Sequence, residues 1–392
     1  MSNVYIVEGA RTPFGSFGGS LKDVSSTELG VTASKEAIKR SGIDPENIDL
    51  SVLGTVIHSS KNAPYLARHI ALQVGIPMSS PALAVNRLCG SGLQSIVSAT
   101  QSILLGEGEV ALAGGVDSMS LAPYALRESR FGTKLGTPQM DDMLWAALTD
   151  EYIGSGMGVT AENLAEKYAI SREEQDEYAY LSHQRAAAAK NEGKFAEEIA
   201  PVEVKSRKGT ARIDTDEHIR EDTAVEKLAK LKPAFKKDGT VTGGNASGIN
   251  DGAGAVVLAG EQFVQKNNLQ PLVKIVSWGV AGVDPTIMGI GPVPAIKKAL
   301  ENSNLTLDDI DLIEVNEAFS AQYLAVEKEL GLDRDKVNVN GGAIALGHPI
   351  GASGTRVLYS VIKELKRRNQ KYGIASLCIG GGQGIAMVVE AL

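Results

Sequence analysis

The sequence predicts an α/β protein built from two related halves. Three observations indicate this: glycine makes up 43 of the 392 residues, strand-like apolar runs alternate with helical spacing, and one helix–strand unit occurs twice. An excess of glycine is typical of the many tight strand-to-helix turns of such folds. A chain of this length buries roughly 75% of the surface of its unfolded form, which is enough for two core units.

The repeated unit reads as a helix, a turn and a buried strand. Residues 35–50 align with residues 297–312 without a gap, and the strands fall at residues 50–53 and 312–315. The identical pairs are Lys35 and Lys297, Ala37 and Ala299, Ser41 and Ser303, Ile48 and Ile310, Asp49 and Asp311, and Leu50 and Leu312. Two glycine-rich cysteine turns, one in each half, also support a duplication.

Apolar spacing predicts the neighbouring elements. A strand covers residues 4–7 at the N-terminus. Apolar residues at helical spacing after Cys89 predict a helix that Gly106 ends, followed by a buried strand at residues 110–113. Near the C-terminus, a strand at residues 373–377 runs into the second cysteine turn.

A charged, helix-rich segment interrupts the first half. Ser171 and Glu174 form a capping box for one of its helices, and Thr160 is expected to cap another. We therefore divide the chain into a first half of residues 1–118 that residues 250–270 complete, an inserted domain of residues 119–249, and a second half of residues 271–392.

Composition excludes several classes of protein. The net charge is −8 and no basic cluster is long, which argues against nucleic acid as a partner. No apolar run is long enough to span a membrane. Two cysteines and five histidines show no metal-ligand spacing, and no metal is expected. Low cysteine usage and an immediate N-terminal strand, which leaves no room for a signal peptide, predict a cytoplasmic protein.

Both cysteines lie beside glycines, which favours catalysis. Cys89 precedes Gly90 and Gly92 at the expected start of a helix, where free N–H groups and the helix dipole favour the thiolate and lower the thiol pKa. Two interpretations of Cys89 remain open: it is a nucleophile, or it is a small buried residue in a helix-entry turn. The glycines of residues 380–384 favour a tight turn with exposed amides beside Cys378, because the further residues of a phosphate-binding motif are missing.

His348 and Asn316 are the other candidates. His348 lies in the glycine-rich loop of residues 341–354 and suits a base or an oxyanion donor, with a surface histidine as the alternative. Asn316 follows a repeated strand at its carboxyl end, where open parallel sheets place their sites. It holds a water or a carbonyl oxygen on one interpretation and caps a helix on the other.

Six stretches together resemble the thiolase family, almost from end to end of the chain. They are residues 11–15, 86–92, 244–248, 316–319, 341–354 and 378–384. Thiolases exchange an acyl group between a 3-ketoacyl-CoA and CoA, or condense two acetyl-CoA molecules in reverse. The resemblance implies a five-layered α-β-α-β-α fold, made of two duplicated βαβαβαββ halves and an inserted loop domain.

The resemblance also implies a role for each candidate. Cys89 takes the acyl group as a thioester, His348 removes its proton, and Cys378 is the acid and base for the carbon acid or leaving group. Asn316 positions a water that completes one oxyanion hole with His348. The backbone amides of Cys89 and Gly380 form the other. This is covalent catalysis split into two acyl transfers.

Coenzyme A is implied as a substrate and product, with no permanently bound cofactor. Ser247 would bind its pantetheine amide and Arg220 its adenine-nucleotide phosphate, with a solvated arginine as the alternative for Arg220. The other residues implied to contact CoA or the acyl group are Met157, Phe235 and Phe319 in the pantetheine tunnel, with Leu148 and Met288.

One departure from the family pattern bears on the acyl group. Gly156 precedes Met157 where acetoacetyl-CoA thiolases often have histidine, and residues 65–69 and 130–134 look like those of mitochondrial-type 3-ketoacyl-CoA thiolases. We therefore expect a broad-range 3-ketoacyl-CoA thiolase of fatty acid metabolism, with an acetoacetyl-CoA-specific enzyme as the alternative. A homo-oligomer is expected, either a dimer or a tetramer built as a dimer of dimers. Two other functions are less favoured. A ketoacyl-ACP synthase lacks the second reactive cysteine, whereas this chain has Cys378, and a non-catalytic lipid-carrier relative tends to lose the reactive residues that are present here.

Overall fold

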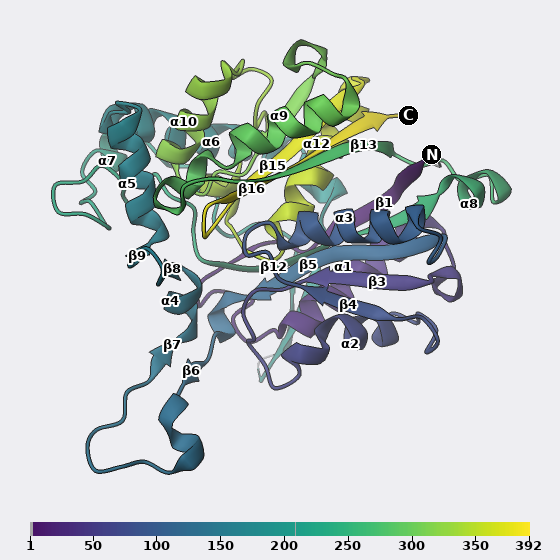
Figure 1. The fold of residues 1–392 in the computed structure, drawn as a ribbon, viewed down its shortest axis with the longest axis horizontal. Helices are drawn as coiled ribbons and strands as arrows, with labels where there is room; N and C mark the ends of the chain where they lie inside the picture. The colour runs from purple at the N-terminus through teal and green to yellow at the C-terminus, as the bar shows by residue number, and fades with distance from the viewer. Residues whose placement is uncertain (1–2, 208) are drawn as a thin grey trace.

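The computed structural model describes residues 3–207 and 209–392, and its largest element is a ten-stranded sheet (Figure 1). Its strands are β1 (Val4–Arg11), β2 (Gly15–Ser16), β3 (Leu50–Gly54), β4 (Ala82–Val85), β5 (Val110–Ser118), β12 (Asn250–Gly260), β13 (Val273–Gly282), β14 (Leu312–Val315), β15 (Tyr372–Ile379) and β16 (Gln383–Ala391). They are ordered β14-β15-β16-β13-β1-β12-β5-β3-β4, and β2 pairs with β12.

Each half contributes the same arrangement of strands to this sheet. In the first half β1, β12 and β5 are antiparallel neighbours and β3 is parallel to β5. In the second half β13, β16 and β15 are antiparallel neighbours and β14 is parallel to β15. The halves join where β1 pairs with β13 over two residues, Tyr5 and Ile6. The matching order confirms the predicted duplication.

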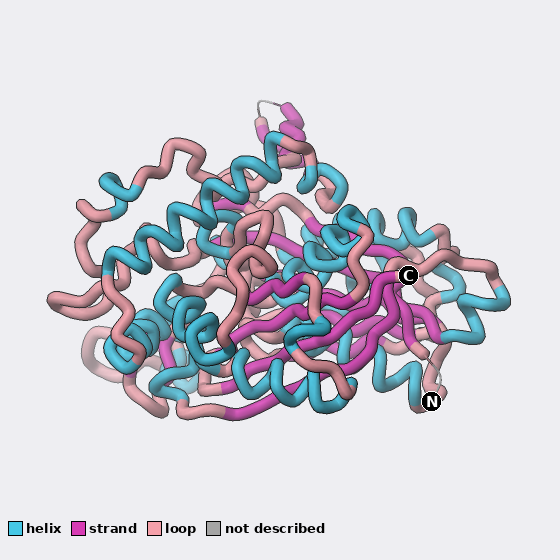
Figure 2. Tube along the Cα trace, turned by 90° about the horizontal axis from the view of Figure 1, so that it is seen from above, coloured by secondary structure: helices cyan, strands magenta, loops and turns pink. Residues whose placement is uncertain are grey.

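Helices complete five layers around and between the two half-sheets. Residues of α3 (Ser91–Leu104) and α12 (Ser353–Arg368) share one buried cluster with strands of both halves, so these helices form the middle layer. The outer layers are α1 (Ser26–Ser41) and α2 (Leu66–Gln73) on the first half, and α9 (Pro292–Ser303) and α10 (Ser320–Leu330) on the second. Figure 2 shows the strands running side by side, with helices along both sides.

The two middle helices begin against each other. A Cβ added at Gly92 would lie 2.8 Å from the backbone nitrogen of Thr355, and one added at Gly354 would lie 2.3 Å from that of Leu93. Glycine is therefore needed where the first turns of α3 and α12 meet. This contact brings the loop before each helix to one place.

The second half departs from the predicted βαβαβαββ pattern at its third strand. Where the first half has β4, the second has a single parallel bridge between Val337 and Ile313. The next residue, Asn338, has a positive φ of 48°, and its side chain bonds both the N–H and the C=O of Val315. Because the amide side chain replaces the next rung of the ladder, the chain leaves the sheet there.

The segment between β5 and β12 contains small sheets and several helices. Its strands are β6 (Tyr124–Ala125), β7 (Asp141–Asp142), β8 (Thr149–Asp150), β9 (Ser155–Gly156), β10 (Val202–Ser206) and β11 (Gly209–Ile213). Its helices are η3 (Met119–Leu121), η4 (Arg127–Phe131), α4 (Met143–Ala147), α5 (Met157–Lys167), α6 (Arg172–Asn191), η5 (Lys194–Glu197) and α7 (Val225–Leu228). The loop between β6 and β7 projects from the body (Figure 1). The domain boundaries remain a prediction.

The capping predictions in this segment have opposite outcomes. Ser171 and Glu174 form the expected capping box at the start of α6. The prediction for Thr160 is wrong, because α5 begins at Met157 with Gly156 as its N-cap. The Thr160 hydroxyl donates to the Met157 carbonyl within the helix, at 2.6 Å.

The remaining helices are short. They are α8 (Glu261–Lys266), α11 (Ala343–Leu346), η1 (Pro45–Asn47), η2 (Ala63–Tyr65), η6 (Pro285–Ile290) and η7 (Leu307–Asp309). Among the described residues, no helix combines the length and the apolar character needed to cross a membrane.

Candidate active site

The two cysteine turns meet at the start of α3. A Cβ added at Gly90, the N-cap of α3, would lie 2.5 Å from Cδ1 of Ile379, and one added at Gly380 would lie 3.2 Å from Cδ1 of Leu88. Because both positions are glycine, the turns can touch. The backbone N–H groups of Gly380 and of Cys89 itself then favour the Cys89 thiolate, since both lower the pKa of this thiol. These are the two amides that the sequence analysis assigns to an oxyanion hole.

Local side-chain bonds hold the Cys89 turn in a strained conformation. Leu88 has a φ of 46°, a region in which a non-glycine residue costs about 1–3 kcal/mol. Its N–H donates to Oδ1 of Asn86 at 2.9 Å. The Ser91 hydroxyl accepts from the Arg87 N–H at 2.8 Å and donates to the Leu88 carbonyl at 2.7 Å. These bonds fix the direction in which Cys89 leaves the turn.

Burial dominates the acidity of both thiols. Cys89 is partly buried and Cys378 fully buried. The apolar surroundings raise the pKa of Cys89 to about 11, although the Gly380 N–H lowers it. Burial and the neighbouring Cys89 raise the pKa of Cys378 even further. The predicted lowering of the Cys89 pKa is therefore wrong: the residue precedes the N-cap and packs against the apolar residues Ile57, Met119, Leu144 and Ile350. Both sulfurs are thiols at rest, and a base must take the proton during the reaction.

His348 is a buried, neutral imidazole, so the surface alternative is wrong. It is 5% exposed, and burial, with the charge of Arg356, lowers its pKa to about 3. Its Nδ1 lies 2.5 Å from the Ser353 hydroxyl oxygen, which donates its own hydrogen to the Pro349 carbonyl at 2.9 Å. The serine oxygen therefore accepts from Nδ1–H, and Nε2 keeps its lone pair. This is the tautomer that a general base requires.

Asn316 lies beside the unprotonated nitrogen of His348. Its Nδ2 is 3.4 Å from Nε2 of His348, and its side chain is completely buried. It is not a helix cap, because α10 begins four residues later with Phe319 as its N-cap. The following Glu317 anchors this loop by accepting hydrogen bonds from Tyr178 and from other buried groups.

A buried carboxylate that the sequence analysis missed ties the two halves together. Asp117, near the end of β5, accepts hydrogen bonds from the N–H groups of Ile57 at 3.0 Å and Gly351 at 2.7 Å. Burial raises its pKa to about 6. Ser353 was also missed, although its place at the start of the helix after the His348 loop is a usable signal. No local pattern marks Asp117, because its partners are far away in the sequence.

The residues expected in the pantetheine tunnel gather beside the Cys378 turn. Phe235 and Phe319 pack edge to face, with ring centroids 6.0 Å apart. The Met157 sulfur lies 3.3 Å from the position of a Cβ at Gly380. Met288 is fully buried in the core cluster that includes Phe319 and against which Met157 packs. The structure thus places these four expected residues together.

The other expected contact residues lie around this group. The N–H of Ser247 donates to the carbonyl of Ala318 at 2.9 Å, next to the Asn316 loop. Leu148 packs against the apolar cluster that also contacts Cys89. Arg220 is exposed, and its backbone N–H donates to His183 at 3.2 Å. Its side chain is solvated, and its assignment to a phosphate remains a prediction.

The structure does not show a direct path for a proton between His348 and the cysteines. Within residues 3–207 and 209–392, no hydrogen bond joins His348 to either cysteine sulfur. Catalytic hydrogen bonds often shorten only when substrate is present. In the same part of the chain, no group of three or more His, Cys, Asp or Glu residues is arranged to hold a metal ion.

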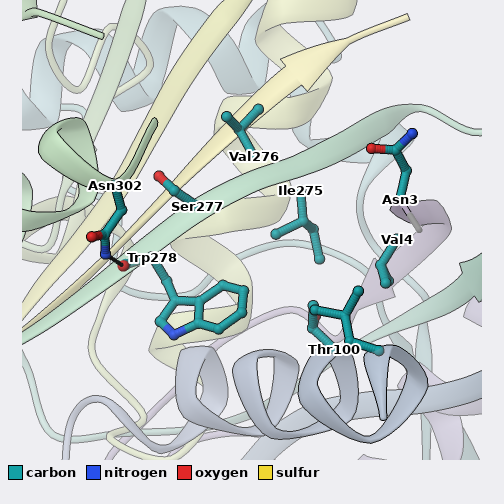
Figure 3. Close-up of a pocket in the computed structure, with 9 residues that line it drawn as sticks. Asn3, Val4, Thr100, Ile275, Val276, Ser277, Trp278 and Asn302 are labelled. Carbon is teal, nitrogen blue, oxygen red and sulfur yellow. Dashed lines mark hydrogen bonds between the residues drawn. The ribbon is translucent and has the colours of Figure 1, made fainter. Parts of the chain in front are cut away.

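The groove in Figure 3 is separate from this site. It has a volume of about 270 Å³ and lies between Thr100, Ile275 and Trp278. Thr100 stands near the C-terminal end of α3, whereas Cys89 precedes its N-terminal end. The Asn302 side chain beside this groove already donates to the Trp278 carbonyl, at 2.9 Å.

Comparison with known proteins identifies the family. The chain matches the thiolase N-terminal domain over residues 4–262 and the thiolase C-terminal domain over residues 269–391. The chain belongs to the thiolase family. It is 55% identical to the human protein named 3-ketoacyl-CoA thiolase, mitochondrial, over 100% of this chain and 99% of the relative. It is therefore an enzyme, an acyltransferase of the thiolase type.

Solved thiolase structures share the whole fold. The crystal structure of human mitochondrial 3-ketoacyl-CoA thiolase in complex with CoA has a TM-score of 0.97 and 54% identity, and the match covers 100% of this chain and 98% of that one. The Bacillus anthracis acetyl-CoA acetyltransferase has a TM-score of 0.98 and 51% identity, over 100% of this chain and 99% of that one. These similarities confirm the fold class predicted from the sequence.

The predicted cytoplasmic localisation is contradicted by the relatives. Similar proteins from human, orangutan, cattle, mouse and rat are all named mitochondrial 3-ketoacyl-CoA thiolases. Cysteine usage and the lack of a membrane-spanning run fit any reducing compartment. They could not distinguish the cytoplasm from another such compartment.

Proposed function

We propose that this thiolase exchanges acyl groups of varied length between 3-ketoacyl-CoA and CoA through a thioester on Cys89. In reverse it condenses acetyl-CoA to acetoacetyl-CoA. The observation that carries the proposal is the meeting of two thiols at the start of α3, where Cys378 neighbours Cys89 and Cys89 packs against Ile350 of the loop that carries the neutral His348. The N–H groups of Gly380 and Cys89 also favour the Cys89 thiolate. Acyl transfer by covalent catalysis needs each of these parts.

Cleavage begins at Cys89. His348 accepts the thiol proton at Nε2, and the sulfur attacks the keto carbon of the 3-ketoacyl-CoA. The alkoxide that forms is held by the N–H groups of Cys89 and Gly380. Its collapse breaks the carbon–carbon bond and releases the enolate of acetyl-CoA, which takes a proton from Cys378. His348 and a water positioned by Asn316 stabilise the enolate oxygen, as the second oxyanion site.

The second transfer regenerates the enzyme. The Cys378 thiolate takes the proton of an incoming CoA thiol, whose sulfur attacks the thioester on Cys89. The same two amides hold the oxyanion, and Cys89 leaves as a thiol after the proton on His348 returns to it. The raised pKa of Cys378 makes it a weak acid and a strong base, which suits a group that must exchange protons with a carbon acid.

Coenzyme A is proposed as the substrate that occupies the tunnel beside Met157, Phe235 and Phe319. The human relative's structure in complex with CoA supports this assignment. Ser247 lies beside the Asn316 loop, where it can meet the pantetheine amide. Arg220 is exposed at the edge of this region, where its guanidinium can meet a phosphate from solvent.

A cavity beside the Cys89 turn supports a broad acyl range. Its volume is about 360 Å³, and its walls include Leu88 of the turn, Ile57, and Met143 and Ala147 of α4. A Cβ placed at Gly156 would have no atom closer than 3.6 Å. A side chain could therefore be accommodated at position 156, and the glycine there leaves that space open.

We also propose that the enzyme works as a homo-oligomer. The edge of the sheet at β4 carries exposed apolar side chains, with Leu83 at 51% and the nearby Met78 at 86% exposure. The projecting loop between β6 and β7 exposes Phe131 and Leu135. Unpaired apolar edges of this kind favour association with another chain.

A chain-length series tests the proposed function directly. Purified enzyme is given CoA and 3-ketoacyl-CoA substrates of four to eight carbons, and cleavage is followed by the loss of their ultraviolet absorbance. We expect kcat/KM to be similar across the series. Cleavage of the four-carbon substrate alone would favour the acetoacetyl-CoA-specific alternative. No cleavage of any substrate would contradict the thiolase activity, and the Cys89→Ala variant provides the blank.

A further inference from the structure

One buried arginine contacts the site but has no part in the mechanism described above. Arg356 lies in the first turn of α12 and is 1% exposed. Its Nη1 is 3.2 Å from a carboxylate oxygen of Glu314, and its Nη2 is 3.5 Å from Oδ1 of Asn316. Its Nε–H has no partner among the described residues. A buried guanidinium with an unpaired N–H is costly, so packing alone does not explain this residue.

The hydrogen bonds around Arg356 have only one consistent direction. A guanidinium can only donate, so the oxygen of the Asn316 amide must face Arg356. The amide nitrogen then faces Nε2 of His348 and donates to its lone pair. The opposite nitrogen of His348 donates to Ser353, whose hydrogen goes to Pro349. The chain of bonds runs from Arg356 through Asn316 to His348.

We propose that Arg356 is a positioning residue that fixes the amide orientation of Asn316, so that the Asn316 N–H group supports the His348 tautomer that Ser353 sets. This inference rests on the proposed function, because the roles of both residues belong to the thiolase reaction.

A rotated Asn316 amide would disable the base. With Oδ1 turned toward His348, the amide oxygen would compete with the Ser353 oxygen for the imidazole hydrogen. It would favour the tautomer with the hydrogen on Nε2, which has no lone pair there for the Cys89 proton. The N–H donor of Asn316 would also be lost from the oxyanion site. By holding Oδ1, Arg356 excludes this arrangement.

Glu314 holds Arg356 in place. It lies on β14, two residues before Asn316, and its side chain is buried beside the guanidinium. Burial raises the pKa of Glu314 to about 8, while Arg356 lowers it. The residue that binds Arg356 therefore lies on β14, and the residue that Arg356 orients directly follows the end of this strand.

A double-mutant cycle between Arg356 and Asn316 tests the inference. Arg356→Lys keeps the positive charge, but one ammonium cannot reproduce the fork that reaches Glu314 and Asn316 together. We expect kcat for acetoacetyl-CoA cleavage to fall about 10²-fold with little change in KM, as for a misoriented catalytic group. In an Asn316→Ala background the same change should have no further effect on kcat. Effects that multiply would overturn the inference.

Two further variants separate positioning from stability. Arg40→Lys replaces an arginine of the outer helix α1 that bonds backbone carbonyls away from the site, and it should leave kcat unchanged. If Arg356→Lys does not fold, the neutral pair Glu314→Gln with Arg356→Met replaces it in the cycle and should give the same result. A wild-type enzyme without any cleavage activity would instead refute the proposed function, so the two failures are distinguishable.

Discussion

The loops that precede the two middle helices stand at matching places in the two halves but carry different chemistry. Ser91 begins α3 and Ser353 begins α12, and each donates its hydroxyl hydrogen to a carbonyl of its own loop. Ser91 accepts from a backbone N–H and closes the turn that carries Cys89. Ser353 accepts from His348 and sets its tautomer. A serine at the first position of the helix therefore holds the nucleophile in one half and the base in the other.

The strand ends differ in a similar way. Asp117 stands near the end of β5, and Cys378 stands near the end of the matching strand β15. Asp117 binds backbone N–H groups from both halves, whereas Cys378 is a candidate acid and base. The two cysteine turns are thus not equivalent, because Cys89 precedes a helix and Cys378 ends a strand. The duplication is supported by the strand order instead.

The largest effect is expected where the first half supplies the nucleophile. Cys89→Ala removes the atom that carries the acyl group, so cleavage and condensation should both fall by roughly 10⁴–10⁶-fold. Rates of acetoacetyl-CoA cleavage and of acetyl-CoA condensation measure this. Wild-type rates in the variant would show that the two loops have been assigned the wrong roles.

The contact between the two turns is the next target. A Cβ at Gly90 would lie 2.5 Å from Cδ1 of Ile379, so Gly90→Ala should move the Cys89 and Cys378 turns apart. A misplacement of about 1 Å can cost about 10²-fold in rate. Ile379→Val removes the clashing atom and should restore part of kcat in the double variant. An unaffected single variant would mean that the spacing of the turns does not limit catalysis.

Asp117→Asn tests the carboxylate that joins the halves. An amide cannot accept all the hydrogen bonds that the Asp117 carboxylate accepts. We therefore expect the free energy of unfolding to fall by about 1–3 kcal/mol and kcat to fall as well. Because burial raises the pKa of Asp117 to about 6, its contribution to stability is complete below about pH 4 and is lost as the pH rises through 6. The advantage of wild type over Asp117→Asn in urea unfolding should therefore be larger at pH 5 than at pH 7.5. The reverse order would contradict the assigned pKa.

The smallest effect concerns the acyl group alone. Gly156→His adds an imidazole beside Met157, where the structure has room for a side chain. Each methylene that can no longer be buried costs about 0.8 kcal/mol of binding. Cleavage of the four-carbon substrate should persist while kcat/KM for six- and eight-carbon substrates falls. An unchanged chain-length profile would mean that position 156 does not shape the acyl site.

Sequence reasoning could predict the parts of this site that are local. The helix after Cys89, the strand before Cys378 and the helix–strand repeat follow from residue spacing, and the structure confirms them. The candidates Cys89, Cys378, Asn316 and His348 were each marked by glycines or by a strand end. Their convergence matches the expectation, although their roles stay predictions.

The parts that depend on distant contacts could not be predicted. Asp117 and Arg356 act through partners that tertiary packing brings to them. The prediction of a lowered pKa for the Cys89 thiol was wrong for the same reason. The local helix terminus favours the thiolate, but the apolar cluster around Cys89 opposes it. Burial is a property of the whole fold.

The division of roles between the two halves is tested most directly by mapping where an acyl group is attached. Cys378→Ala is incubated with acetyl-CoA, and its peptides are analysed by mass spectrometry. The account predicts an acetyl group on Cys89, since His348 can still take its proton, together with a loss of condensation by roughly 10²–10⁴-fold. A variant that fails to acetylate Cys89 but still condenses acetyl-CoA, or a wild-type enzyme acetylated only on Cys378, would contradict it.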